Sequence, residues 1–183
     1  MTVYQRFDPT KRYTRLLVHH DRVVQSAEAN DEWAMNDYRL RGLMDILFKS
    51  GDLVSGAQCV TDIQAKLAKL EAGRLYVDAA VHPIEAAQLA IATEGNVYVG
   101  AYLQRDVVTH LQDPTLKNPA QGTRGWDEPG ADRERITLVW GIKDDGTAGE
   151  FFPVWLIEDC NVRPKEPPPN IDAVTQALAR YDE

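Results

Sequence analysis

Short stretches of alternating apolar and polar residues fill most of the chain after Gly51, and they limit the fold more than any other feature. Apolar residues recur at every second position in residues 75–81 (LYVDAAV), 97–104 (VYVGAYLQ) and 135–142 (RITLVWGI). This period of two is typical of β-strands with one buried face. The pattern predicts an α+β protein that is mostly β, with an antiparallel sheet or sandwich as its main domain.

Shorter segments fit the same scheme. Residues 53–60 and 88–93 are predicted to be strands, and residues 15–18 (RLLV) could form another. Residues 63–71 (IQAKLAKLE) fit either a short helix or one arm of a hairpin. Residues 143–146 (KDDG) are typical of a hairpin turn between residues 135–142 and 151–158. Pro153 in the second of these strands indicates an edge position or a bulge.

The clearest helix signal lies in residues 26–48, within a helical region that we place at 26–50. Ser26 can cap its N-terminus, and Glu28 and Asp31 suit the positive end of the helix dipole. Its apolar seam positions alternate three and four residues apart, with one polar member, and are Trp33, Asn36, Leu40, Leu43 and Leu47. This heptad spacing over two repeats has two interpretations: a helix packed on its own sheet, or a self-association seam.

Three other regions complete the predicted organisation. Residues 1–25 are predicted to be an extended arm, because Pro9 interrupts any continuous helix. Residues 51–163 form the β-rich domain. Residues 164–183 contain a Pro-rich spacer and a short helix with an apolar face ending near Tyr181.

Residues 113–133 (DPTLKNPAQGTRGWDEPGADR) form a long Pro- and Gly-rich connection inside the β-rich domain. A loop of this length without regular structure is uncommon in a compact domain and is usually functional. Trp126 in this loop is either a plug tucked into the domain or an anchor for a partner, because exposed large aromatic residues are common interface anchors.

The bulk composition excludes several classes of protein. The formal charge of −8 argues against binding nucleic acid or an anionic membrane, which requires a local excess of Lys and Arg. The N-terminus has no apolar signal core, and no apolar run reaches about 18 residues. We therefore expect synthesis in a cytoplasm and no membrane insertion. Cys59 and Cys160 are expected to be reduced thiols. A disulfide between them is the alternative if their strands are adjacent.

The search for chemistry yields no catalytic, cofactor-binding or metal-binding residues. His19 and His20 are neighbours, so on a strand they would point to opposite faces and would not converge on a metal. No phosphate-binding Gly-rich loop and no GxSxG motif occurs. The carboxylates of the long loop are more simply explained by solvation or ion pairing than by glycoside hydrolysis.

Several ordered motifs together resemble one family. They are residues 7–9 (FDP), 13–17 (YTRLL), 24–31 (VQSAEAND), 51–56 (GDLVSG), 113–116 (DPTL), 118–120 (NPA), 128–131 (EPGA) with Arg133, 152–154 (FPV), 166–169 (EPPP) and 174–182 (VTQALARYD). This set resembles the domain of unknown function found at the N-terminus of tailed-phage and prophage tail-fibre or baseplate proteins.

The resemblance implies a non-enzymatic virion protein of the phage tail, made in the bacterial host cytoplasm. It would act as the attachment domain of a tail fibre or as a tail–baseplate adaptor. Its partners would be copies of itself, expected to form a trimer, and other tail or baseplate proteins, but neither nucleic acid nor membrane. The residues expected at its interfaces are Tyr4, Phe7, Tyr13, Trp33, Asn36, Leu40, Leu43, Leu47, Arg124, Trp126 and Tyr181.

Three alternatives remain at this point. The chain could be a receptor- or glycan-binding module that stacks Trp126 and Tyr102 on sugars. It could be a glycan-degrading enzyme that uses the loop carboxylates Asp127 and Glu128. It could also be an assembly chaperone that is absent from finished particles.

Overall fold

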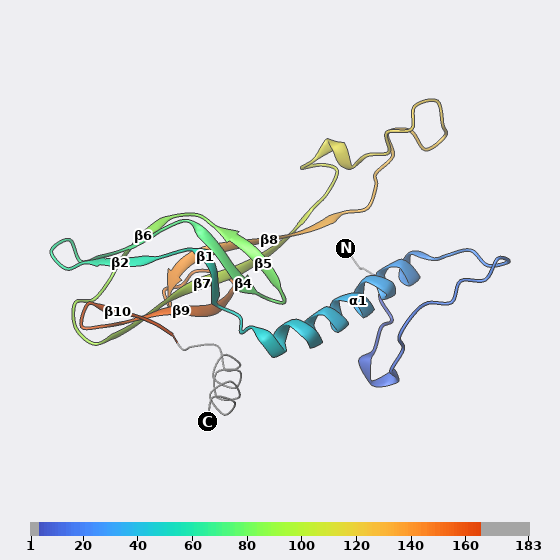
Figure 1. The fold of residues 1–183 in the computed structure, drawn as a ribbon. Helices are drawn as coiled ribbons and strands as arrows, with labels where there is room; N and C mark the ends of the chain where they lie inside the picture. Colours follow the sequence, from blue (N-terminus) through green and yellow to red (C-terminus); the bar gives the residue numbers. More distant parts are fainter. Residues whose placement is uncertain (1–3, 166–183) are drawn as a thin grey trace, which may run out of the picture. The chain divides into compact units, whose positions relative to one another are not determined.

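The computed structural model describes residues 4–165 and divides the chain into two compact units (Figure 1). The first unit holds the N-terminal arm and the helix α1, and the second begins at Ser50 and holds every described strand. The predicted helix near Tyr181, and residues 166–169 of the predicted spacer, lie outside the described residues.

The long helix is present where the sequence predicts it. Helix α1 spans Ser26–Leu47, and its N-cap is Gln25 instead of the predicted Ser26. The Glu28 side chain accepts a hydrogen bond from the Gln25 backbone N–H at 2.8 Å. Glu28 therefore satisfies a backbone donor just before the helix as well as complementing the helix dipole.

The second unit confirms a mostly β, α+β fold. A seven-stranded sheet has the order β1-β4-β5-β8-β7-β9-β10, and a three-stranded sheet has the order β2-β3-β6. All neighbours are antiparallel except β5 and β8. The strands are β1 (Asp52–Gly56), β2 (Cys59–Asp62), β3 (Leu67–Leu70), β4 (Gly73–Val77), β5 (Ala80–Ile84), β6 (Ala87–Ala90), β7 (Asn96–Val108), β8 (Arg133–Ile142), β9 (Glu150–Glu158) and β10 (Asn161–Pro164).

One hydrophobic core joins the two sheets. It takes Ala68 and Leu70 from the small sheet and residues such as Leu75, Val99 and Ile157 from the large one. Burying such side chains removes apolar surface from water, which is the main favourable contribution to folding. Trp155 belongs to this core and donates a hydrogen bond from Nε1 to the Ala57 carbonyl at 3.1 Å.

Two predicted strands are in fact pairs of strands. The alternation in residues 75–81 runs across a hairpin turn, because Asp78 and Ala79 have φ values of 55° and 61° between β4 and β5. Two successive positive φ values are the geometry of a type I′ turn. Residues 53–60 are likewise broken at Gly56 and Ala57, so β1 and β2 belong to different sheets.

Three smaller predictions are also resolved. Residues 63–71 form a turn followed by β3, which corresponds to the hairpin interpretation. Residues 15–18 form no strand. Pro153 lies at a bulge, because the pairing of β7 with β9 passes from Val99–Trp155 to Gly100–Pro153. The edge interpretation is wrong, since β9 lies between β7 and β10.

Strands β7 and β8 extend away from the rest of the sheet as a two-stranded ribbon (Figure 1). Their pairing continues without a break from Val99–Ile142 to Val108–Arg133. Cross-strand ion pairs join Arg135 to Asp106 at 2.6 Å and Arg105 to Glu134 at 3.5 Å along the outer part. The ribbon therefore holds the Pro- and Gly-rich connection, which spans residues 109–132, away from the core.

Candidate assembly surfaces

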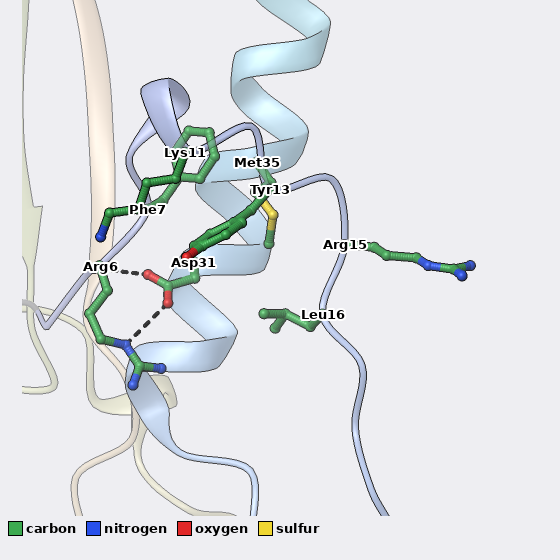
Figure 2. A pocket seen from close by; sticks show the side chains of 8 residues that line it. All are labelled: Arg6, Phe7, Lys11, Tyr13, Arg15, Leu16, Asp31 and Met35. Atoms are coloured by element: carbon green, nitrogen blue, oxygen red, sulfur yellow. Dashed lines mark hydrogen bonds and ion pairs between the residues drawn. The ribbon is translucent and has the colours of Figure 1, made fainter.

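One face of α1 is covered by the N-terminal arm (residues 4–25). Ala27, Asp31 and Met35, each four residues apart, are the buried residues of the helix. The Arg6 backbone N–H donates to Asp31 Oδ1 at 2.5 Å, and the Arg6 Nε donates to Asp31 Oδ2 at 3.3 Å (Figure 2). A buried carboxylate with such donors is a strong local tether, because ionic hydrogen bonds are stronger than neutral ones.

Aromatic and amide contacts extend this docking. The rings of Phe7 and Tyr38 lie 5.8 Å apart between centroids, and the Asn30 side-chain amide donates to the Tyr4 carbonyl at 2.9 Å. The side chains of Tyr4 and Tyr13 stay largely exposed. The arm is thus held to its own helix, with two aromatic rings still available to other molecules.

A pocket of about 340 Å³ lies between the arm and α1 (Figure 2). Asp31 and Met35 are the buried residues of its lining, which also includes Arg6, Phe7, Lys11, Tyr13, Arg15 and Leu16. Arg6 is neutralised by Asp31 and by Glu28, whose carboxylate is 3.9 Å away. Lys11 and Arg15 make no ion pair within residues 4–165, and Figure 2 shows Arg15 pointing away from the other lining residues. The pocket thus combines apolar and aromatic side chains with cations at its rim.

The five seam residues of α1, which we call the apolar stripe (Trp33, Asn36, Leu40, Leu43 and Leu47), are exposed. Trp33 is 76% exposed and Leu43 is 66% exposed. Trp33 is two positions from both Asp31 and Met35, which places it about 200° round the helix from the arm-covered face. The helix therefore has two distinct faces, one covered by the arm and one whose apolar side chains are exposed within residues 4–165.

The connection at the end of the ribbon, which we call the ribbon tip (residues 109–132), is ordered by its own backbone. It contains a short 3₁₀ helix at Pro114–Leu116 and an isolated bridge between Lys117 and Pro129. The Asn118 N–H donates to the Glu128 carbonyl at 2.9 Å, and the Gly130 N–H donates to the Leu116 carbonyl at 3.0 Å. The expectation of a wholly irregular loop over 113–133 is therefore wrong.

Trp126 and Arg124 both lie on the ribbon tip and are exposed. Trp126 is 55% exposed, which excludes a plug buried in the domain and leaves the anchor interpretation. Asp127 forms an ion pair with Lys117 at 2.8 Å, which agrees with the interpretation of the loop carboxylates as solvated or ion-paired groups. Tyr102 is buried and donates from its hydroxyl to the Ile142 carbonyl, so it offers no ring to a sugar.

The arm and the ribbon tip each contain the same capped turn, Asp-Pro-Thr. Asp8 accepts hydrogen bonds from the N–H and hydroxyl of Thr10 before the 3₁₀ helix Pro9–Lys11, and Asp113 accepts the same pair from Thr115. The threonine hydroxyl and then the N–H lower the pKa of each carboxyl below its usual value. Both turns are therefore stabilised by the charged form of the aspartate.

The two cysteines are free thiols in the structure. Burial raises the pKa of Cys59 to about 11, so this thiol is neutral at physiological pH. Within residues 4–165, no group of three or more His, Cys, Asp or Glu side chains is placed to hold a metal ion. Of the helices in this part of the chain, none has the length and apolar content needed to span a bilayer.

The predicted interface residues fall in both units of the chain. Tyr4, Phe7 and Tyr13 lie on the arm beside α1, whereas Arg124 and Trp126 lie on the ribbon tip, and Tyr181 lies outside the described residues. The sequence reasoning missed Met35 and the role of Asp31 as the tether of Arg6. The spacing of Ala27, Asp31 and Met35 was the available signal, since residues four apart share one helix face.

Comparisons with known proteins give one extensive match. A family model described as domain of unknown function DUF4815 matches residues 2–183. Among solved structures, the chain is similar to one chain of the baseplate complex from the type VI secretion system, with a TM-score of 0.44 and 10% identity. The similarity covers 91% of this chain and 64% of that chain, so this chain spans less than two thirds of its length. No curated protein matches.

Proposed function

The chain belongs to the DUF4815 family, and from this premise we propose that it is a structural subunit that assembles with copies of itself in the tail of a bacteriophage. In this proposal it is the attachment domain of a tail fibre or a tail–baseplate adaptor, and it performs no catalysis. The tail setting derives from the family resemblance of its motifs. The assembly mechanism derives from the geometry of α1.

The observation that carries this proposal is the uncovered apolar stripe of α1. A surface helix normally buries its apolar face, and here the buried face is a different one, occupied by the arm. The stripe keeps heptad spacing over two repeats, which is the geometry for knobs-into-holes packing between parallel or antiparallel helices. Copies of the same helix are the simplest partner for such a stripe. Asn36 would then be the one polar residue in the seam, a position that commonly fixes register and oligomer state.

The assembly is tested by replacing Leu40 and Leu43 with Glu in the full chain. We expect the wild-type protein to form an oligomer, with a trimer as the expected state, and the L40E/L43E variant to be a 20.5 kDa monomer. Two carboxylates on the stripe would be desolvated and would repel their symmetry mates in the assembled state. Light scattering after size exclusion gives the mass.

The matched control is R39Q/R41Q, which changes the net charge by the same two units on the flanks of the stripe. This variant is expected to keep the wild-type mass. A wild-type chain that stays monomeric at high concentration contradicts the proposal, as does a double Glu variant with unchanged mass and unchanged helix content.

The location is tested on purified tail particles from the virus that encodes the chain. We expect an antibody against the ribbon tip or the arm to label one end of the tail in negative-stain images, because a structural subunit stays in the finished particle. Label in the lysate with unlabelled particles would instead indicate an assembly chaperone.

A further inference from the structure

The ribbon tip carries an excess of negative charge beside an exposed aromatic ring. Its 24 residues include four carboxylates, Asp113, Asp127, Glu128 and Asp132, against the two cations Lys117 and Arg124. Glu128 follows Trp126 by two residues, is exposed, and makes no ion pair within residues 4–165. The internal hydrogen bonds of the tip hold this acidic and aromatic group in place before any partner arrives, which lowers the entropic cost of binding.

The pocket between the arm and α1 has the opposite character. Its lining includes Phe7, Tyr13 and Met35, and the cations Lys11 and Arg15 lie at its rim, where neither makes an ion pair within residues 4–165 and Arg15 points away from the cavity (Figure 2). A volume of about 340 Å³ is at the small end for binding pockets, and it suits one large side chain better than a folded ligand. Aromatic rings and a thioether are favourable neighbours for an inserted aromatic ring.

We propose that the ribbon tip of one copy docks in the arm pocket of another copy, with Trp126 inserted beside Phe7 and Tyr13 and with Glu128 facing Lys11 or Arg15. The inference rests on the proposed self-assembly and names the second contact within it. It joins two different surfaces, so it is a heterologous contact, and such contacts close into a ring when the rotation between copies permits. Opposite charges on the two surfaces also fix the orientation of docking.

This contact is too small to hold two copies together alone. One inserted ring and its surroundings bury far less than the roughly 1,200 Å² of the smallest stable interfaces. Association through the apolar stripe would raise the effective concentration of tip and pocket, so the contact is expected within the assembled oligomer. The test therefore uses the full chain at concentrations where it is oligomeric.

A photo-crosslinking amino acid at position 126 tests the docking directly. Copies that carry the probe in ¹⁵N-labelled chains are refolded together with unlabelled copies, irradiated, digested and analysed by mass spectrometry. We expect crosslinks from position 126 of a heavy chain to residues 6–16 or 31–35 of a light chain. The control is the same probe at Val60, an exposed apolar position on β2, which should give no crosslink to those residues.

Crosslinks between position 126 and the pocket of the same chain would overturn the proposal, as would crosslinks only to other regions or none at all. Light scattering of the same sample separates the two proposals. An oligomer without the expected crosslink removes the docking and leaves the proposed function intact. A sample that is monomeric by light scattering would contradict both the docking and the proposed self-assembly.

Charge reversal provides a second measurement. Glu128→Lys, or Lys11→Glu with Arg15→Glu, is expected to lower the heavy–light crosslink yield by about two- to fivefold, the range for partly exposed ion pairs. Combining the reversals on both surfaces should restore the yield. Additive loss in the combined variant would show that these charges do not face each other and would overturn the assigned pairing.

Discussion

Replacing Gly100 with Ala is expected to destabilise the β domain by about 3 kcal/mol or more, at or beyond the upper end for an overpacked core. A Cβ atom at this position would lie 2.2 Å from the Phe152 carbonyl oxygen and 2.8 Å from the Pro153 Cα. Both atoms belong to the backbone of the internal strand β9 at its bulge, so they cannot move aside without disturbing the pairing with β7. Urea unfolding, monitored by circular dichroism, measures the loss of stability as a lower urea concentration at the unfolding midpoint.

The matched control is Gly42→Ala, the same substitution in the interior of α1. An added Cβ there meets no atom within 4 Å. This variant is expected to stabilise the helix by about 0.5–1 kcal/mol, because Ala loses less backbone freedom than Gly in a helix. An unchanged unfolding midpoint for Gly100→Ala would show that the bulge accommodates the added methyl group without cost, which contradicts the close packing of Gly100 against β9.

The second large effect is expected from Asp31→Ala, which should release the N-terminal arm from α1. The substitution removes both carboxylate acceptors of Arg6 in a site where Asp31 is only 8% exposed. Losing a buried partner of this kind costs about 1–3 kcal/mol, which raises the population of the undocked arm by about 5- to 150-fold. Hydrogen exchange of the amides in residues 6–16 measures the opening.

The control for this variant is Asp37→Ala on the same helix. Asp37 forms an exposed pair with Arg41 at 2.7 Å, and such pairs contribute little. Hydrogen exchange of the arm amides should therefore stay at the wild-type rate in this variant. Arm exchange in Asp31→Ala that matches Asp37→Ala would contradict the role of Asp31 as the tether.

The sequence predicted the type of each long element well, because each has one dominant period. The alternation in residues 97–104 and 135–142 gave the central strands, and the seam from Trp33 to Leu47 gave the helix, but the seam left open whether that face is packed on the sheet or exposed. The failures came where a period crosses a turn. Asp78 and Ala79 adopt positive φ without a glycine, so the alternation around them looked like one strand.

The arm side of α1 was harder to predict for a different reason. Asp31 is a charged residue in a buried position, and a helix wheel assigns such a residue to the solvent face. Its burial depends on Arg6, 25 residues earlier, and local patterns carry no information about a contact at that separation. The order of the ribbon tip was hidden in the same way, because its bonds join residues 116–118 with residues 127–130.

The ribbon also has a mechanical consequence. Its two strands run side by side from the tip into the middle of the seven-stranded sheet, where β7 pairs with β8 on one side and β9 on the other. A pull on Trp126 along the ribbon therefore loads the pairing of β7 with β9 in shear, so its cross-strand bonds must yield together, whereas a strand pulled sideways from the edge of a sheet yields one bond at a time. A subunit built in this way can bear tension through its tip.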